Sequence, residues 1–271
     1  MNNILMIGCG HMGSALLKKW TEFKSNKITV IDPIECNKIK KKYKKTKVIV
    51  FKKVNNKIDT KKFDIVVLAV KPQIVSKVLN DYNLLYFKKT CVLISIIAGK
   101  KISFFQKNIP NINQIIRVMP NMPALIGEGV SCITSNKNVT KFNKNLVQKL
   151  FSKVGIVVWL NNEKEIDIAT AISGSGPGYI FYLVDAIEKA SNKLGLNKKI
   201  NNKIVLQTFL GSLKLLMNSK NTAKELADKI AIKGGTTEAG IKLMKDKNLE
   251  KIIVSALRSA HQRAKILSKI Q

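Results

Sequence analysis

Two patterns of hydrophobic residues divide the chain near residue 162. Before that point, short apolar runs alternate with polar and helical stretches, and runs such as DIVVLAV and CVLISIIA are apolar on both faces. Strands of this kind are typical of a parallel sheet with helices on each side. We therefore predict a doubly wound α/β domain over residues 1–162, with strands at 4–7, 28–31, 48–51, 65–70, 92–97, 115–119, 130–134 and 156–159.

The remaining residues, 163–271, show helical periodicity in place of strand-like runs. A long helix is predicted over about 178–194 and ends at Gly195, and another is predicted over about 199–217. Near the end of the chain one apolar stripe recurs at helical spacing, at Leu249, Ile252, Ile253, Ala256, Leu257, Ala260, Ala264 and Leu267. These patterns predict a second, all-helical domain.

The first predicted strand runs directly into a glycine turn, ILMIGCGHMG, which has the GxGxxG spacing. Gly8 permits a tight turn, Gly10 leaves room for a pyrophosphate, and Gly13 lets the next helix pack closely on the strand. Asp32 ends the second strand about 20 residues later, where a carboxylate meets ribose hydroxyls in dinucleotide-binding folds of the Rossmann type. The order of these features favours a dinucleotide site over a glycine turn in an unrelated βαβ unit.

The formal net charge of +31 is the unusual property of the composition. The arginines are Arg117, Arg258 and Arg263, so lysine supplies nearly all of the positive charge and is spread over many segments. Nucleic-acid sites more often combine arginine with interleaved aromatic residues. We attribute the charge mainly to AT-rich codon usage, and we expect weak binding to nucleic acid at low salt and no specific nucleic-acid partner.

Targeting signals and metal motifs are not evident. The first apolar run is too short for a signal peptide, and no stretch reaches the roughly 20 apolar residues of a membrane span. Cys9, Cys36, Cys91 and Cys132 lack the spacing of a zinc site, so we expect reduced thiols, no metal and a cytoplasmic protein without a membrane partner.

Three motifs follow later strands of the first domain. AVKPQ, at 69–73, should line the ligand crevice at the end of a strand, where Lys71 either faces a ligand or is simply solvated. SIIAG, at 95–99, would let the nicotinamide end of a cofactor pass close to the backbone. RVMPNMP, at 117–123, is a rigid elbow that is able to wall the same pocket.

Two further motifs lie in the helical half. SGSGPGY, at 173–179, places glycines where a helix is predicted, and we expect another backbone to approach them closely. GGTTEAG, at 234–240, sets two hydroxyls at the start of a helix. Thr236 or Thr237 can cap that helix, or the same amides and hydroxyls can bind a small carboxylate.

Taken in order, GCGHMG, AVKPQ, RVMPNMP, SGSGPGY and GGTTEAG resemble the pyrroline-5-carboxylate reductase family over essentially the whole chain. The resemblance implies that a hydride passes from NADH or NADPH to the C=N carbon of 1-pyrroline-5-carboxylate and gives L-proline, the last step of proline biosynthesis. It also implies a homodimer through the helical domain, with decamers of five dimers in some members.

The family's site residues are carried over to the matching positions. The resemblance implies cofactor contacts at Gly8, Cys9, Gly10, His11, Met12, Gly13, Asn56, Ala69, Val70, Lys71, Pro72, Ile96, Ile97 and Ala98, to which Asp32 is added from the turn argument. It implies substrate contacts at Glu163, Gly234, Gly235, Thr236 and Thr237, with Thr237 hydrogen bonding at the imine nitrogen. Thr237 and Lys71 are the catalytic candidates. His11 and His261 are interpreted as structural residues, because neither is placed as a general acid.

The sequence departs from the family at two motifs. Ile232 and Lys233 replace the usual Ser-Pro before the glycine pair, which loosens that turn, and Gly178 replaces the commoner alanine. Asp32 repels a 2′-phosphate and favours NADH, although Lys38 and the lysines at 40–42 are able to offset its charge.

Two competing interpretations remain at this point. One is a reductase of the same two-domain build that acts on a β-hydroxy acid or another cyclic imine, but GGTTEAG has no place in the hydroxy-acid class. The other is a basic binding protein that retains the fold without catalysis, against which the intact glycines and threonines argue.

Overall fold

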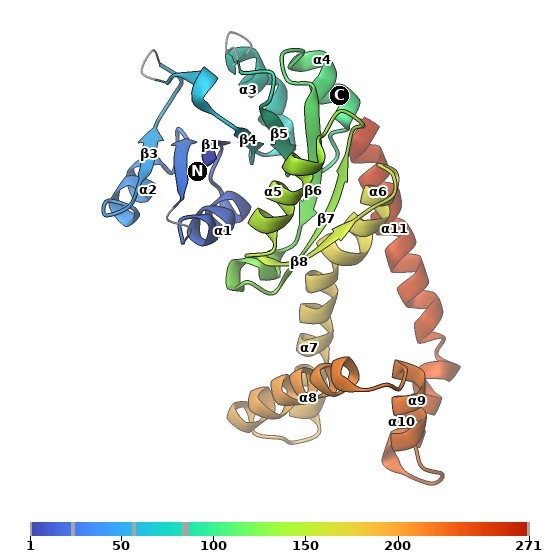
Figure 1. Cartoon of the computed structure of the whole chain (residues 1–271). Helices are drawn as coiled ribbons and strands as arrows, with labels where there is room; N and C mark the ends of the chain where they lie inside the picture. The colour runs from blue at the N-terminus through green and yellow to red at the C-terminus, as the bar shows by residue number, and fades with distance from the viewer. Residues whose placement is uncertain (1, 23–24, 56–57, 83–86, 270–271) are drawn as a thin grey trace. The chain divides into compact units, whose positions relative to one another are not determined.

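The computed structural model describes residues 2–22, 25–55, 58–82 and 87–269 (Figure 1). Its strands are β1 (Asn2–Ile7), β2 (Asn26–Ile31), β3 (Val48–Phe51), β4 (Ile65–Leu68), β5 (Val92–Ser95), β6 (Gln114–Pro120), β7 (Gly129–Ser135) and β8 (Gly155–Trp159). Its α-helices are α1 (His11–Trp20), α2 (Cys36–Lys42), α3 (Val75–Tyr82), α4 (Ile102–Asn108), α5 (Lys141–Phe151), α6 (Glu165–Ala169), α7 (Gly176–Lys193), α8 (Lys198–Asn218), α9 (Ala223–Ile230), α10 (Thr236–Asp246) and α11 (Leu249–Lys269). Short 3-10 turns occupy Thr60–Lys62, Pro72–Ile74 and Met122–Ile126, and a π-helical turn spans Thr170–Gly174.

The chain forms two compact units. The first contains Met1–Ser175 together with Ala260–Gln271, and the second contains Gly176–Ser259. The expected eight strands and the expected change to helices are both confirmed, so the fold class is a Rossmann-type sheet followed by helices. These compact units reflect contacts within the chain and do not test a domain boundary. The division at residue 162 therefore stays a prediction.

All eight strands belong to one sheet in the order β3-β2-β1-β4-β5-β6-β7-β8. Every neighbouring pair is parallel except β6 and β7, which are antiparallel with Arg117 opposite Thr134. Because β1, β2, β4 and β5 are parallel neighbours, their carboxyl ends lie at one edge of the sheet. That edge is where ligands bind in folds of this kind.

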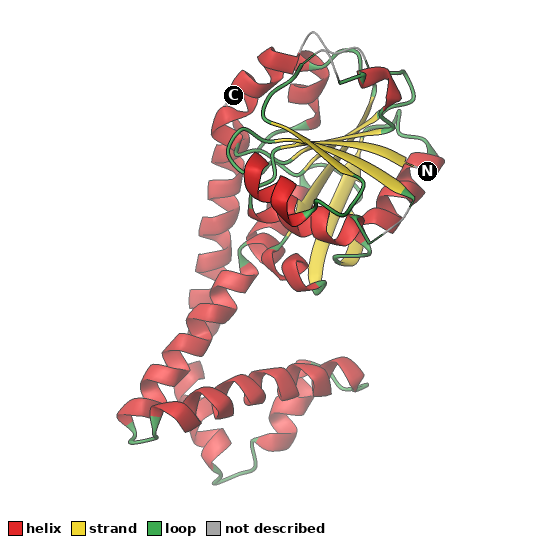
Figure 2. Ribbon diagram, turned by 90° about the vertical axis from the view of Figure 1, so that its left-hand side faces the viewer, coloured by secondary structure: helices red, strands yellow, loops and turns green. Residues whose placement is uncertain are grey.

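Helices cover both faces of the sheet (Figure 2). Side chains of β1 alternate between two clusters: Ile4 and Met6 pack with residues of α1, α2 and α5, whereas Leu5 and Ile7 pack with residues of α3 and α4. The apolar residues on both sides of each central strand are explained by this two-sided burial.

Trp20 anchors the first of these faces. The side chain is fully buried at the end of α1, its ring meets Phe151 edge to face with centroids 5.5 Å apart, and its Nε1 donates a hydrogen bond to the carbonyl of Leu150 at 2.9 Å. A buried indole needs such an acceptor. This contact fixes α1, and with it the glycine turn that precedes α1, against α5.

The helical unit is held by a buried amide where α7 and α8 meet. Gly195 ends α7 in the left-handed conformation with φ 94°, as the sequence predicts. The Asn201 side chain is buried and donates to the carbonyl of Glu188 at 2.7 Å and to Oδ1 of Asn192 at 2.9 Å. The two helices therefore form a hairpin with a defined register.

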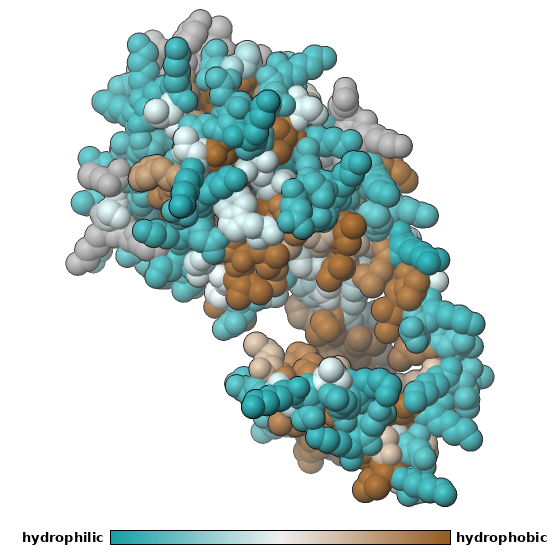
Figure 3. Space-filling view, turned by 45° about the vertical axis from the view of Figure 1, so that its right-hand side comes forward, coloured by the Kyte–Doolittle hydropathy of each residue, from teal (hydrophilic) through white to brown (hydrophobic). Residues whose placement is uncertain are grey.

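Most other apolar side chains of this unit are exposed (Figure 3). On α7 they include Phe181 and Tyr182, which are 59% and 74% exposed, and on α8 they include Leu213 at 50%. Large exposed apolar surfaces mark sites of association. Among the described residues, no helix is both long and apolar enough to span a membrane.

Candidate active site

The expected cofactor residues gather at the carboxyl edge of the sheet. The glycine turn of residues 8–13 follows β1, Asp32 follows β2, residues 69–72 follow β4, and residues 96–98 follow β5. These strands are consecutive neighbours, so the structure brings the four segments together. Asn56 lies outside the described residues.

The glycines of the turn differ in what surrounds them. Gly8 has φ 85°, and a Cβ there would lie 2.6 Å from Val70 Cγ1 and 2.7 Å from the carbonyl oxygen of Ala69. A Cβ on Gly13 would lie 3.0 Å from the carbonyl oxygen of Gly8. Gly10 is exposed, with no described atom within 4 Å of an ideal Cβ. The first two glycines are thus explained by packing, whereas Gly10 leaves open space at the surface of the turn.

Helix α1 begins directly at this open space. Gly10 is its N-cap and provides no side-chain hydrogen bond, and the first turn carries no acidic residue. Backbone N–H groups at a helix N-terminus attract anions. The cradle therefore fits a pyrophosphate, as the glycine spacing predicts.

Replacing Gly10 by alanine tests this interpretation. The added methyl group has room in the protein but occupies the open side of the turn, so we expect kcat/KM for NAD(P)H to fall by about 100-fold with little change in melting temperature. Steady-state kinetics and a thermal melt measure both effects. An unchanged kcat/KM would show that no pyrophosphate approaches Gly10.

Asp32 is tied to the protein backbone by both carboxylate oxygens. Oδ2 accepts a hydrogen bond from the N–H of Cys9 at 2.7 Å, and Oδ1 accepts from the N–H groups of Ile34 and Glu35 at 2.8 Å each. The side chain is buried. Asp32 therefore holds the glycine turn against the end of β2, a role that the sequence argument did not include.

Cys9 lies inside this turn as a protonated thiol. Burial raises its pKa to about 12, with further increases from the nearby carboxylates of Asp32 and Glu35, and burial likewise raises the pKa of Cys91 to about 12. All four cysteines are free and buried. The thiol is thus a packing group and not a nucleophile.

Alkylation measures the state of these thiols. At pH 8 a pKa near 12 leaves roughly one thiol in 10,000 as thiolate, so Cys9 and Cys91 should resist iodoacetamide in the folded protein and react after unfolding. Since folding raises the pKa from 9.0, the stability that these thiols contribute is complete below pH 9 and is lost as the pH rises toward 12. Rapid labelling of the native protein at pH 8 would contradict this assignment.

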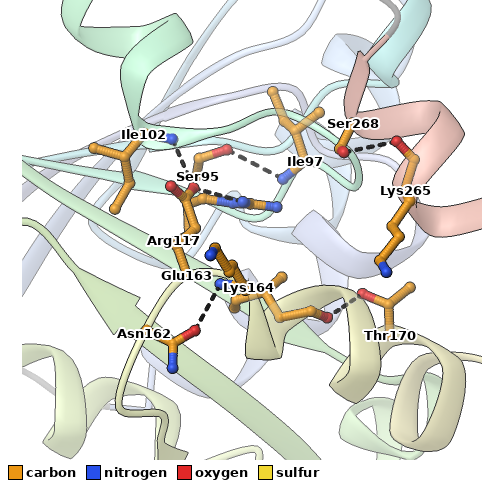
Figure 4. Close-up of polar contacts among 11 residues, drawn as sticks. Ser95, Ile97, Ile102, Arg117, Asn162, Glu163, Lys164, Thr170, Lys265 and Ser268 are labelled. Atoms are coloured by element: carbon orange, nitrogen blue, oxygen red, sulfur yellow. Dashed lines mark hydrogen bonds and ion pairs between the residues drawn. The ribbon is translucent and has the colours of Figure 1, made fainter. Parts of the chain in front are cut away.

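Lys71 and Glu163 differ in the contacts that their side chains make with the rest of the protein. Lys71 is exposed and precedes the turn at Pro72, and its side chain is free to meet a ligand at the sheet edge. Glu163 Oε1 accepts a hydrogen bond from the N–H of Ile102 at 2.7 Å and forms an ion pair with Arg117 at 2.5 Å (Figure 4). One oxygen of Glu163 is thus committed to the protein.

The expected substrate segment lies at the N-terminus of α10. Gly235 is the N-cap, and neither Thr236 nor Thr237 caps the helix, contrary to the capping alternative. Their hydroxyls form no hydrogen bond with any residue that the structure describes. The turn is closed instead by Gly235 N–H, which donates to the carbonyl of Ile232 at 2.9 Å, and by Gly234 N–H, which donates to Glu238 Oε2 at 2.7 Å. The turn is therefore closed without the family's proline.

The SGSGPGY segment is partly explained. A Cβ on Gly174 would lie 2.8 Å from Met119 Cε, so a side chain and not a backbone approaches it. No described atom lies within 4 Å of the Cβ positions of Gly176 and Gly178. The expected backbone approach is not found among the residues that the structure describes. The π-helical turn at Thr170–Gly174 is a feature often located at functional sites.

Two residues near the site were not singled out as functional by the sequence argument. Ser95 ends β5 and is buried, and its Oγ accepts a hydrogen bond from Ile97 N–H at 3.2 Å. Arg117 begins the expected RVMPNMP elbow, but its ion pair with Glu163 was not predicted. A polar residue at the end of an apolar strand was the available signal for Ser95.

The fold and the sheet edge define a dinucleotide-dependent oxidoreductase. In agreement with this class, residues 3–99 match the family described as NADP oxidoreductase coenzyme F420-dependent, and residues 163–267 match the pyrroline-5-carboxylate reductase dimerisation family. A pyrroline-5-carboxylate reductase of Haemophilus influenzae is 32% identical over 264 residues, covering 96% of each protein. The chain belongs to the pyrroline-5-carboxylate reductase family.

Solved structures of the family agree over the whole length. The reductase of Coxiella burnetii is 31% identical with a TM-score of 0.89 and covers 99% of each chain. The Plasmodium falciparum enzyme, solved with NADP bound, is 31% identical with a TM-score of 0.86 and covers 99% of this chain and 98% of its own. The chain is therefore an NAD(P)H-dependent reductase with a C-terminal dimerisation segment.

Proposed function

We propose that the segments described above divide the work of reducing 1-pyrroline-5-carboxylate to L-proline, the last step of proline biosynthesis and the reaction of this family. Residues 8–13, 32, 69–72 and 96–98 would hold the dinucleotide, together with Asn56. The observation that carries this proposal is the convergence of four strand ends beside the open cradle at Gly10. NAD(P)H, when bound, supplies the hydride.

The protein groups on the cofactor side bind the dinucleotide and orient it. The N–H groups at the start of α1 meet the phosphates, and Asp32 keeps that turn in place through Cys9 N–H. From there the sheet order β2-β1-β4-β5 leads to residues 96–98, where the nicotinamide end would lie. Lys71 is exposed between these points and would contact the cofactor or the reacting centre.

The protein groups on the substrate side belong to the turn that leads into α10 and to the first turn of that helix. The N–H groups and hydroxyls of Gly234, Gly235, Thr236 and Thr237 would bind the substrate carboxylate, and Thr237 would hydrogen bond at the imine nitrogen. Two unpartnered hydroxyls at a helix N-terminus support this assignment. A cyclic imine is basic enough to be partly protonated, so aligning it and excluding water are the main tasks.

The coenzyme preference follows from the end of β2. Asp32 and Glu35 place two carboxylates there, and Lys38 is paired with Glu35 at 3.3 Å. Lys40, Lys41 and Lys42 lie in the last turn of α2, away from its start. This arrangement favours NADH, because a 2′-phosphate would approach the carboxylate of Asp32, which has no lysine paired with it among the ion pairs described.

The decisive experiment measures oxidation of NADH and of NADPH by the purified protein with 1-pyrroline-5-carboxylate. We expect turnover with both coenzymes and a higher kcat/KM for NADH. A higher value for NADPH would reject the preference, and absence of turnover with intact nucleotide binding would reject the substrate.

The assembly is a homo-oligomer, since the C-terminal segment is of the dimerisation family. We further propose a decamer of five dimers, with the domains divided at residues 162 and 163 as the start of the matched segment suggests. A cytoplasmic location is proposed on the strength of four buried, unpaired thiols. Light scattering of the purified protein measures the assembly size.

A further inference from the structure

One polar cluster holds both ends of the loop that follows β5 (Figure 4). At the start of the loop, Ser95 Oγ accepts the N–H of Ile97 at 3.2 Å. At its end, Glu163 Oε1 accepts the N–H of Ile102 at 2.7 Å and pairs with Arg117. Arg117 lies opposite Ser95 in the register of β5 and β6. Loop 96–101 is therefore fixed at both ends by neighbouring groups.

The Glu163 carboxylate acts electrostatically on two groups, the N-terminus of α4 and the guanidinium of Arg117. The N-cap of α4 is Lys101, which makes no side-chain hydrogen bond to the helix. The Glu163 carboxylate supplies the missing acceptor at the positive end of α4. It also neutralises Arg117, whose side chain is 4% exposed and would otherwise be a buried unpaired charge.

The middle of the loop is held by the end of α11. Gly99 has φ 77°, and a Cβ there would lie 2.8 Å from the carbonyl oxygen of Leu267. Glu163 and Leu267 are the first and last residues of the segment that matches the dimerisation family. One end of that segment thus contacts the loop itself at Gly99, and the other contacts Ile102, the residue directly after the loop, within the first compact unit.

We propose that Glu163 is a positioning residue: through Arg117 and the N–H of Ile102 it fixes loop 96–101 against the nicotinamide end of the dinucleotide. This inference rests on the proposed function, because it takes the cofactor to lie along the edge of β2, β1, β4 and β5. The adenosine end would lie near β1 and β2, away from the loop. Disturbing Glu163 should therefore affect the two ends of the cofactor differently.

The test compares Glu163→Gln with Glu165→Gln. Glutamine keeps an acceptor for Ile102 but removes the charge that pairs with Arg117. Glu165 is the matched control, since its carboxylate contacts only the nearby Asn161 N–H and Asn162 side chain, at 3.0 and 2.7 Å, among the hydrogen bonds described for it. The measurements are kcat, KM for NADH, KM for 1-pyrroline-5-carboxylate and the affinity for ADP-ribose, which lacks nicotinamide.

For Glu163→Gln we expect kcat/KM for NADH to fall roughly 10- to 100-fold, while ADP-ribose affinity and KM for 1-pyrroline-5-carboxylate change less than about twofold. Equal weakening of ADP-ribose binding would mean a general structural role and would overturn the proposal. A change confined to KM for 1-pyrroline-5-carboxylate would mean direct substrate contact and would also overturn it. The Glu165→Gln variant should resemble the wild type.

A second variant guards against misfolding. The double change Arg117→Met with Glu163→Gln leaves no buried charge unpaired, so it should fold if the single variant does not, and it should show the same loss toward NADH with ADP-ribose affinity retained. A double variant with the wild-type kcat/KM for NADH and the wild-type affinity for ADP-ribose would overturn the proposal. If the wild type itself fails to reduce 1-pyrroline-5-carboxylate, the proposed function fails instead, so the two failures are distinguishable.

Discussion

Replacing Thr237 by alanine is expected to lower kcat by about 100-fold or more while leaving the melting temperature nearly unchanged. The reason is that the hydroxyl does not stabilise its own helix. Gly235 is the N-cap of α10, and Thr237 makes no side-chain cap hydrogen bond. Removing the hydroxyl thus removes a group whose proposed partner is the imine nitrogen of the substrate.

Two further variants make this result specific. Thr237→Ser retains the hydroxyl and should retain most of kcat. Thr236→Ala removes the neighbouring hydroxyl, proposed to bind the carboxylate, and should raise KM for 1-pyrroline-5-carboxylate more than it lowers kcat. Steady-state kinetics with thermal melts separate the three. A Thr237→Ala enzyme with normal kcat and a lower melting temperature would assign the hydroxyl to packing.

Replacing Gly8 by alanine should destabilise the protein by about 2–5 kcal/mol and abolish nucleotide binding at ordinary temperature. Gly8 has φ 85°, which strains any residue with a side chain, and its Cβ would also overlap Val70 Cγ1 and the Ala69 carbonyl, at 2.6 and 2.7 Å. Backbone atoms cannot move aside cheaply here, because Ala69 N–H is bonded to the carbonyl of Ile7 at 2.8 Å.

Urea unfolding measures this loss, with Gly13→Ala as the matched comparison in the same turn. A Cβ on Gly13 has its closest approach at 3.0 Å and no positive φ, so the cost should be smaller. With Gly10→Ala added, we expect the free energy of unfolding to increase in the order Gly8→Ala, Gly13→Ala, Gly10→Ala. A Gly8 variant as stable as the wild type would mean that the turn adopts another conformation in solution.

The sequence was sufficient for the architecture, because the signals concerned are local. The central strands β4 and β5 are runs of apolar residues that are buried on two sides, and Gly195 is found where helix α7 must end with a positive φ of 94°. The observed α7 and α8 begin within two residues of the expected bounds. Such features depend on neighbours in the chain, which is why pattern alone predicts them.

The contacts within the site were harder to predict from the sequence, for a physical reason. Glu163 meets Ile102 N–H and Arg117 across 61 and 46 positions of sequence, and no periodicity encodes such a pairing. Asp32 was expected at the ribose, yet its three backbone hydrogen bonds could not be read from spacing. For the two threonines at the start of α10 the sequence left both capping and ligand binding open, and the N-cap at Gly235 removes the first alternative within one chain.

The contact between Gly99 and Leu267 has a consequence for synthesis of the chain. Residues 260–271 belong to the same compact unit as the sheet, and Ala264 is buried there. The ribosome makes this segment after all of the strands. The loop after β5 therefore gains its neighbour on α11 only after residue 267 has been made, and a product terminated before that residue would leave the loop without this contact.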